Sequence, residues 1–357
     1  MASRQGFAVA LSLMMAVTTA DRTFAQTPDR QARGCWSPPA AETLEEVVHL
    51  AQSRNERAAR QNQTRRLAEP AILALSDGDM RIAYGGGLIA GWGETGYRPA
   101  FAAVLAVGRS ALLAPFAFLG EEGDLKIASL FHCHRAESWT ELGERAVSLT
   151  DSSVVARIAQ RHSSGARLLI ALTASPARSE SVWDIGAIAA SGDPGAIEDI
   201  ANILRAAADP MRGLEGIRSS TWAGRSVPRN WIFREVGSGE PFLSPTPQSG
   251  PIRSYFLIHN GVLFADDSDK FVSQAVPSEP PRPAFSLVTA FDVFTRSKAE
   301  NAHFRFSSVR PKLNLIRQGS YDDTYVRDLF HFAYRQGRMG KEWRDGLPTQ
   351  LAASIKQ

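Results

Sequence analysis

The feature that most constrains the fold is a sharp strand-to-helix turn centred on Gly108. The apolar run Ala102–Val107 is typical of a buried strand, and the apolar segment 111–119 that follows is typical of a helix. Ala106 and Ser110, two residues before and two after the centre, are small enough for the helix to approach the strand closely. Such a turn holds its central residue in a strained conformation at the end of a sheet. The sequence therefore predicts a strand–turn–helix unit within an α/β protein.

Longer blocks on both sides of this turn resemble a known family. The blocks are Ile72–Arg81, Gly86–Pro99, Ala111–Gly120, Val182–Pro194 and Ala333–Gly337. In their order they are similar to the bacterial patatin-like phospholipases, and they extend over most of residues 70–340. The resemblance implies an α/β fold of three layers, α/β/α, with a central mixed sheet. It also relates the chain to lipid acyl hydrolases.

The same resemblance places the two catalytic positions of the family on residues without catalytic chemistry. Family members use a Ser–Asp dyad, in which the serine attacks an ester carbonyl and the aspartate takes its proton. The neighbouring blocks align the serine position with Gly108, and the strand Phe256–Val262 aligns the aspartate position with Asn260. Glycine carries no hydroxyl, and a neutral amide takes no proton from serine. We therefore expect this chain to lack the dyad.

The oxyanion loop of the family is altered as well. Its pattern Gly-Gly-Gly-x-Arg corresponds here to Asp-Gly-Asp-Met-Arg at residues 77–81. Gly78 and Arg81 are retained, whereas Asp77 and Asp79 bring carboxylates beside the place where an oxyanion would form. Like charges there would raise the barrier to hydrolysis. Three altered elements together predict a non-catalytic relative that keeps a lipid or acyl chain as its ligand.

Two rival hypotheses stay open at this point. A shifted turn would make Ser110 the nucleophile of an active lipid acyl hydrolase or esterase, although it puts the branched Leu112 where a small residue belongs. Asp266 and Asp267 could substitute for the missing base, but the segment around them is typical of a solvated turn. The third hypothesis is an interaction protein whose pocket is closed.

The N-terminus predicts export. Arg4 precedes an apolar stretch, Phe7–Val17, that is too short to span a membrane and is followed by small residues. We expect residues 1–25 to be a signal peptide cleaved before Gln26, with cleavage before Asp21 as the second choice. The mature protein would then be periplasmic or secreted.

The two cysteines, Cys35 and Cys133, permit one disulfide bond. The segment Ala32–Cys35 is faintly similar to a lipoprotein motif, but Arg33 interrupts it and Cys35 lies well past the apolar stretch. We therefore favour a protein without a lipid anchor.

The rest of the chain divides into three parts. Residues 26–67 form a polar leader and a charged helix over 41–67, and its Arg-rich segment 54–66 could contact an anionic membrane surface. The resemblance implies a patatin-like domain over residues 68–345, and we expect 346–357 to be a C-terminal tail. The net charge of +3 is too small to indicate nucleic-acid binding.

Apolar runs and periodicity predict the elements of this domain. Expected strands are Ala71–Ser76, Leu168–Ala174, Ser254–Phe264 as a strand–turn–strand, Phe285–Phe294 and Phe304–Val309. Expected helices are Met80–Glu94, Ser110–Leu119, Trp139–Leu149, Ser152–His162, Ala196–Ala208 and Asp322–Gln336. The Gly-, Pro- and Ser-rich segment Asp209–Gly250 is expected to form surface loops.

Other motifs carry little weight. Gly91–Gly96 spells a dinucleotide fingerprint, but it ends a helix instead of joining a strand to one. His132 and His134 would share one face of a strand, yet no further ligands are apparent, so no metal is expected. Asp184 is expected to be a structural hydrogen-bonding residue. We expect no cofactor.

Overall fold

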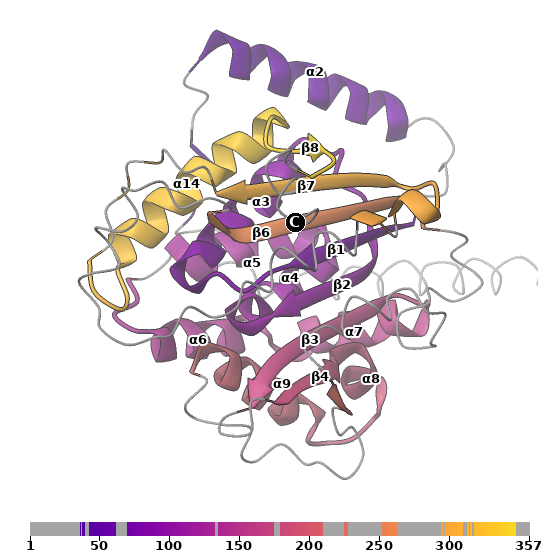
Figure 1. Ribbon diagram of the computed structural model, residues 1–357, viewed down its shortest axis with the longest axis vertical. Coiled ribbons are helices and arrows are strands. Elements are labelled where there is room, and N and C mark those ends of the chain that lie inside the picture. The colour runs from indigo at the N-terminus through magenta and orange to yellow at the C-terminus, as the bar shows by residue number, and fades with distance from the viewer. Residues whose placement is uncertain are drawn as a thin grey trace, which may run out of the picture.

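The computed structural model describes a core of the chain together with short outlying segments (Figure 1). The described residues are 36, 38–39, 43–61, 70–132, 135–174, 179–209, 225–227, 252–262, 294–295, 297–309, 313, 315 and 318–347. The expected signal peptide, Cys35, Cys133, His134, Asp266 and Asp267 lie outside them.

The strands of the described residues form one mixed sheet of eight strands. They are β1 (Ala71–Leu75), β2 (Phe101–Val107), β3 (Arg167–Ala174), β4 (Ser179–Asp184), β5 (Arg225–Val227), β6 (Ser254–Val262), β7 (His303–Val309) and β8 (Arg344–Asp345). The spatial order is β5-β4-β3-β2-β1-β6-β7-β8. The five strands from β3 to β7 in this order pair in parallel, and β4, β5 and β8 pair antiparallel at the edges. The expected α/β fold with a mixed sheet is therefore confirmed.

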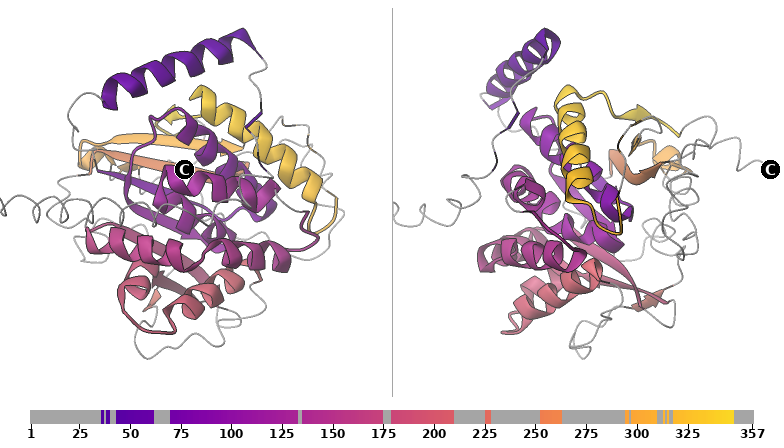
Figure 2. Two further views of the ribbon diagram at one scale, coloured as in Figure 1. Left: turned by 180° about the vertical axis from the view of Figure 1, so that it is seen from behind. Right: turned by 90° about the vertical axis from the view of Figure 1, so that its left-hand side faces the viewer.

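Helices cover one face of this sheet in the described part of the chain (Figure 2). They are α3 (Ile82–Glu94), α4 (Ala114–Leu119), α5 (Glu121–His132), α6 (Trp139–Leu149), α7 (Ser152–Ser163), α8 (Ile185–Ala190), α9 (Ala196–Ala208) and α14 (Asp323–Met339). A further helix, α2 (Leu44–Gln61), lies outside this layer, beyond α14 (Figure 2). Two 3₁₀-helices, η1 (Asp79–Arg81) and η2 (Gly108–Leu112), follow β1 and β2.

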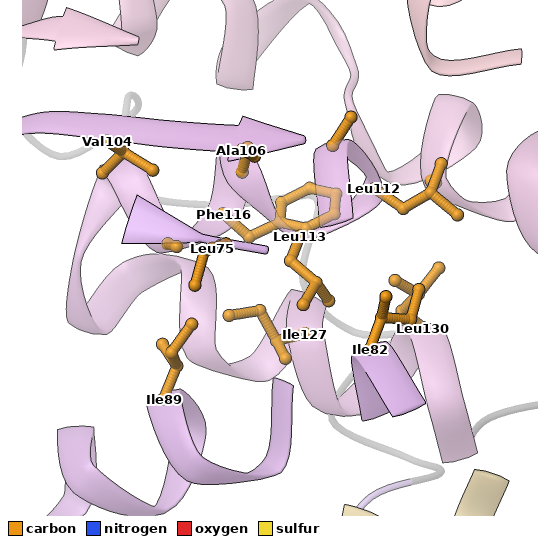
Figure 3. Close-up of a cluster of buried hydrophobic side chains, with 14 of the residues drawn as sticks. Leu75, Ile82, Ile89, Val104, Ala106, Leu112, Leu113, Phe116, Ile127 and Leu130 are labelled. Atoms are coloured by element: carbon orange, nitrogen blue, oxygen red, sulfur yellow. The ribbon is translucent and has the colours of Figure 1, made fainter. Parts of the chain in front are cut away.

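The alternation of side chains along each strand produces two apolar clusters, one on each face. On the helix-covered face, Leu75 and Val104 pack with side chains of the helices, among them Phe116 and Ile127 (Figure 3). On the second face the cluster consists mainly of strand residues, including Leu105. Both faces are buried, which explains why the central strands are continuous apolar runs.

Helices α3 and α14 pack closely because both have glycines where they touch, so their backbones can approach each other. A Cβ atom on Gly87 or Gly91 would overlap backbone atoms of α14, and one on Gly337 would overlap the backbone of α3. Glycine lowers intrinsic helix propensity, so this glycine-rich helix depends on tertiary packing.

Short polar side chains begin several helices. Ser138, Asp151 and Asp322 accept a hydrogen bond from a backbone N–H in the first turn of α6, α7 and α14. Asp184 does the same for α8, where its carboxylate accepts from the N–H of Ala187 at 2.9 Å. Asp184 is therefore a structural residue, as expected.

Most expected elements are confirmed within one or two residues, and α14 continues three residues past its expected end at Gln336. The expected strand Phe285–Phe294 lies outside the described residues except for Phe294. Four other expectations differ from the structure. Strand β6 extends from Ser254 to Val262 instead of forming two strands joined by a turn. Its pairing with β1 ends at Ile258, and its pairing with β7 has a register shift between His259 and Val262. His132 ends helix α5 instead of lying in a strand. The first residues after Gly108 form a 3₁₀ turn before α4 begins. Within the expected loop segment 209–250, residues 225–227 form a short edge strand.

Replacing Gly91 by alanine should destabilise the fold. The new methyl group would overlap the backbone carbonyl of Tyr334, so one of the two helices must shift. We expect a loss of about 2 kcal/mol in the free energy of unfolding, measured by urea denaturation. The control Ile197→Ala removes an exposed side chain and should change it by less than about 0.5 kcal/mol. Equal stability of Gly91→Ala and the wild type would contradict this packing.

Candidate functional site

The candidate site lies where β1, β2 and β6 end. Strand β1 pairs with β2 on one side and with β6 on the other, both in parallel, so the order of strands reverses beside β1. The carboxyl ends of all three strands therefore meet at one edge of the sheet. Such a reversal point is the common position of ligand sites in open α/β sheets.

Gly108 occupies the turn after β2 with a backbone φ of +57°. Residues other than glycine are strained in this left-handed region of backbone conformation. The space that a Cβ would take at this position is filled by the carboxyl group of Asp77, which follows β1. The chain therefore has no nucleophile at the centre of the turn and no room for one while Asp77 keeps this position.

Two backbone N–H groups converge on one oxygen of Asp77. Its Oδ1 accepts a hydrogen bond from the N–H of Gly78 at 2.8 Å and another from the N–H of Arg109 at 3.2 Å. Gly78 belongs to the loop after β1, and Arg109 is the residue directly after the centre of the turn. A carboxylate that accepts two N–H groups is a strong, charge-assisted arrangement. It ties the loop after β1 to the turn after β2.

The side chain of Arg109 closes the outer side of this arrangement. Its guanidinium donates to Asp79 Oδ1 at 2.9 Å and to the carbonyl oxygen of Ala208 at 3.3 Å. It also lies over the ring of Trp139, 4.2 Å from the ring centre. Asp79 has a φ of +53°, an uncommon conformation for a residue with a side chain. The carboxylate of Asp79, the second acidic residue of the loop, is thus held by Arg109.

Asn260, the expected dyad position, is completely buried at the end of β6. Its Nδ2 donates to the carbonyl oxygen of Ser76 at 3.0 Å and to Ser110 Oγ at 2.9 Å. Its Oδ1 accepts from the N–H of Gly85 at 3.0 Å, and its own N–H donates to Ser76 Oγ at 2.9 Å. The side chain uses both amide donors, which an ionised aspartate would not have. Asn260 acts as a connector between β1, η2 and α3.

Ser110 is equally buried, with no exposed surface. Its Oγ donates to the carbonyl oxygen of Ser76 at 2.5 Å and accepts from Asn260. A nucleophilic serine needs a base that takes its proton and a path to the substrate. In this geometry the proton of Ser110 points to a backbone carbonyl, and the neighbouring side chain is a donor.

His259 was not singled out by the sequence, yet it belongs to this site. Its Nδ1 lies 3.2 Å from Ser76 Oγ. Burial, together with the nearby positive charge of Arg81, lowers the pKa of His259 to about 4. The imidazole is therefore neutral at pH 7. The sequence signal that could have placed His259 at the site was its position directly before Asn260, at the end of a strand.

The structure thus brings together Asp77, Gly78, Asp79, Gly108, Ser110 and Asn260, and it adds His259, Arg109 and Ser76. Arg81 lies close enough for its positive charge to lower the pKa of His259. His132 lies elsewhere, packed against Trp36 and His331. Among the described residues, no group of three or more histidine, cysteine, aspartate or glutamate residues could hold a metal ion.

Comparison with protein families, with characterised proteins and with solved structures found no match to this chain. None of the helices in the described ranges combines the length and the apolar character that crossing a membrane requires.

The neutral state of His259 should make stability depend on pH. Its folded pKa of about 4 lies below the ordinary value of 6.5, so the unfolded chain binds a proton first as the pH falls. The contribution is fully present above pH 6.5 and is lost progressively between pH 6.5 and 4, up to about 3 kcal/mol.

We expect the substitution His259→Gln to flatten the dependence of unfolding free energy on pH over this range, as measured by urea denaturation. The control His303→Gln changes an exposed histidine and should leave the slope as in the wild type. A slope that is unaffected by His259→Gln would contradict the buried, neutral imidazole.

Proposed function

We propose that the protein is an exported, non-catalytic relative of the patatin-like phospholipases that binds an acyl chain or lipid without hydrolysing it. The observation that carries the proposal is the carboxylate of Asp77, which accepts the N–H groups of Gly78 and Arg109 beside a turn that has glycine at its centre.

The fold supports the family assignment. The proposed patatin-type arrangement has helical layers on both faces of a mixed sheet, and one such layer is present in the described residues. Parallel crossovers are right-handed, so connections on opposite sides of β1 run over opposite faces of the sheet. In agreement, Phe294 and Ala302, near the end of the connection to β7, pack in the cluster on the second face.

The polar contacts support a loss of hydrolysis at the oxyanion site. In hydrolases with a strand–turn–helix nucleophile, the oxyanion is bound by the N–H of the residue after the nucleophile and by another from a nearby loop. Arg109 and Gly78 occupy the equivalent places if Gly108 is the nucleophile position. Asp77 Oδ1 takes both donors. A substrate oxyanion would have to displace a negatively charged group that is part of the chain.

The dyad positions support the same conclusion. Gly108 supplies no hydroxyl, and the amide of Asn260 is fully engaged with Ser76, Ser110 and Gly85. The rival hypothesis of an active hydrolase needs Ser110 as the nucleophile. That residue is buried and hydrogen-bonded to a backbone carbonyl, and no base accepts its proton.

A second candidate function is a pure interaction protein. The filled turn favours it, because Asp77 occupies the space beside Gly108 where the reacting end of a ligand would lie. Titration of the purified protein with a fluorescent long-chain fatty acid separates the two candidates. Saturable binding supports an acyl ligand, and no binding favours the interaction protein. The proposed contact of the Arg-rich segment 54–66 with membranes can be measured by sedimentation with anionic vesicles.

We expect no hydrolysis of ester or phospholipid substrates above buffer and no labelling by a fluorophosphonate probe. A serine hydrolase needs the nucleophile, the base and the oxyanion donors together. This chain has glycine and asparagine at the nucleophile and base positions, and Asp77 already accepts both N–H donors. Ser110→Ala should leave both results unchanged. Labelling of the wild type that disappears in Ser110→Ala would overturn the proposal in favour of an active enzyme.

The same account predicts which changes restore a reactive serine. The double variant Gly108→Ser/Asn260→Asp should stay unlabelled, because the new side chain meets Asp77 and the donors remain occupied. Adding Asp77→Gly frees the space and both N–H groups, so the triple variant should be labelled by the probe. The matched control is the triple variant with alanine at position 108. Labelling of the double variant to the same extent would contradict the role of Asp77.

Export is tested separately. Mass spectrometry of the protein secreted by a native-type host should find Gln26 as the mature N-terminus, or Asp21 as the second choice. A protein that starts at Met1 and stays in the cytoplasm would contradict this part of the proposal.

A further inference from the structure

Two histidines from different helices pack against each other where α5 and α14 meet. His132 is the last residue of α5, and His331 lies in α14. The centres of their rings are 4.2 Å apart. The Nε2 atom of His132 is buried and has no hydrogen-bond partner in the structure. A buried polar nitrogen without a partner costs free energy, and a charged one costs more.

The ring of Trp36 covers both imidazoles. Its centre lies 4.4 Å from the centre of the His132 ring and 5.5 Å from that of the His331 ring. Trp36 is only 7% exposed, and it also packs edge-on against Phe330 and Tyr334 of α14. We call these five residues the Trp36 cluster. The cluster holds residue 36 against two helices that lie about 100 and 300 positions away in the sequence.

The chain after Trp36 has a second attachment to α14. The guanidinium of Arg338 donates to the carbonyl oxygen of Pro39 at 2.7 Å. It also forms ion pairs with Glu46 of α2 at 3.3 Å and with Glu94 of α3 at 3.2 Å. These contacts do not involve the two histidines. Trp36 can therefore leave its cluster while Pro39 and α2 stay attached.

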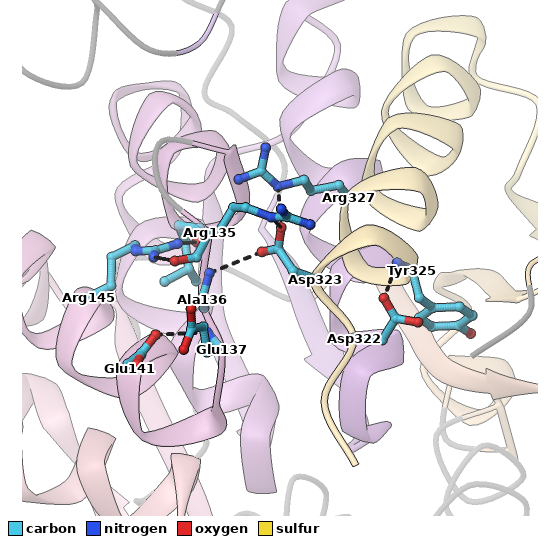
Figure 4. A network of polar contacts seen from close by, with 10 residues as sticks. Arg135, Ala136, Glu137, Glu141, Arg145, Asp322, Asp323, Tyr325 and Arg327 are labelled. Carbon is cyan, nitrogen blue, oxygen red and sulfur yellow. Dashed lines mark hydrogen bonds and ion pairs between the residues drawn. The ribbon is translucent and has the colours of Figure 1, made fainter. Parts of the chain in front are cut away.

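The charged groups that face the two imidazoles belong to α14. Arg327 faces both rings, whereas Arg335 and Asp328 face His331. Arg327 is itself paired with Asp323, at 2.8 Å, in the first turn of α14 (Figure 4). Trp36 contributes an uncharged ring, and α5 contributes His132. Positive charge therefore lies beside both imidazoles, and a proton on one ring would repel a proton on the other.

These surroundings favour neutral imidazoles while Trp36 is in place. Burial, followed by the positive charges of His331 and Arg327, lowers the pKa of His132 to about 3. Burial also lowers the pKa of His331, together with Arg335 and Arg327 and against the opposing charge of Asp328. An imidazole exposed to water has a pKa of about 6.5. Both rings therefore bind a proton more tightly once they are exposed.

We propose that the Trp36 cluster is an acid-sensitive switch, in which protonation of His132 and His331 releases Trp36 from α14. The switch would act on the N-terminal attachment and does not involve the site around Asp77, so it goes beyond the proposed function and does not depend on it.

The direction of the pH dependence follows from linkage. Neutral His132 contributes its full stabilisation of the closed cluster above pH 6.5, and this contribution is lost as the pH falls toward its folded pKa. The ratio of released to closed protein rises about tenfold for each pH unit below 6.5, and thus about a hundredfold by pH 4.5, from His132 alone. Protonation of His331 adds to this change.

Fluorine NMR of the full chain labelled with 5-fluorotryptophan tests the release. The resonance of Trp36 is identified by its loss in Trp36→Phe. We expect it to move to the position of a water-exposed tryptophan as the pH is lowered from 7 to 4.5, and to return when the pH is raised. Trp92, which is buried among other aromatic rings, should not move. A Trp36 resonance that stays buried at pH 4.5, or one that moves together with Trp92 on global unfolding, would overturn the switch.

Variants that keep an aromatic ring but bind no proton separate titration from packing. In His132→Phe/His331→Phe, Trp36 should stay buried at pH 4.5, and each single variant should need a lower pH for release than the wild type. The single variants give this readout even where the double variant does not fold. His303→Gln, a change at an exposed position, is the matched control and should release Trp36 as the wild type does. Unchanged release in the phenylalanine variants would contradict the role of the histidines.

The coupling is reciprocal, so removal of the indole must change the histidines. In Trp36→Ala we expect His132 and His331 to bind protons at least about tenfold more tightly, as measured by proton NMR titration of their ring resonances. His259, which lies in the separate site at the end of β6, is the internal reference and should titrate as in the wild type. Equal proton affinities of His132 and His331 in Trp36→Ala and in the wild type would overturn the proposal.

Discussion

The candidate site depends on one carboxylate that accepts two backbone N–H groups. Asp77 follows β1 and binds the N–H groups of Gly78 and Arg109, so that it joins the loop after one central strand to the turn after the next. Its other oxygen lies where the side chain of a nucleophile would begin. Under the proposed relation to patatin-like hydrolases, the two N–H groups that would stabilise a transient anion instead bind a carboxylate of the chain itself.

Asn260 connects the third strand to the same site. The proposed relation assigns the base of the hydrolase dyad to this position, and the amide of Asn260 instead donates to Ser76 and to Ser110. Burying these polar groups costs little free energy because each of them has a hydrogen-bond partner. The network fixes β1, β6 and η2 relative to each other. His259, neutral because it is buried, completes the network at Ser76 without adding a charge.

The sequence predicted the parts of this structure that follow from local pattern. The apolar runs of β1, β2 and β3 and the helices α6, α7 and α9 were found within one or two residues, and α14 continues three residues past its expected end. Strands buried on both faces and amphipathic helices leave clear periodic signals. The gathering of Asp77, Gly108 and Asn260 followed from the resemblance and not from any local signal. Strand β6 was misjudged at His-Asn-Gly, residues 259–261, since these residues favour turns in isolation. In the structure these residues form an irregularity in the pairing with β7, after which the strand resumes at Val262, and the amide of Asn260 is held by Ser76, Ser110 and Gly85.

Other features could not be read from the chain, because they depend on contacts between distant segments. Nothing local indicates that Asp77 fills the space beside Gly108, that the pKa of His259 is lowered, or that Trp36 lies against His132. Each arises from burial between elements that are far apart in sequence. The acidic loop was expected to oppose an oxyanion by repulsion. The structure adds that Asp77 itself accepts the N–H groups of Gly78 and Arg109.

Hydrogen exchange at the Gly78 and Arg109 amides tests the central claim most directly. If Asp77 Oδ1 accepts both N–H groups, both amides exchange slowly in the wild type and about tenfold faster or more in Asp77→Ala, because each loses a charge-assisted hydrogen bond. The amide of Gly85, which is held by Asn260, serves as the internal reference and should not change. Fast exchange of Gly78 and Arg109 in the wild type, or exchange rates unaffected by Asp77→Ala, would contradict the account.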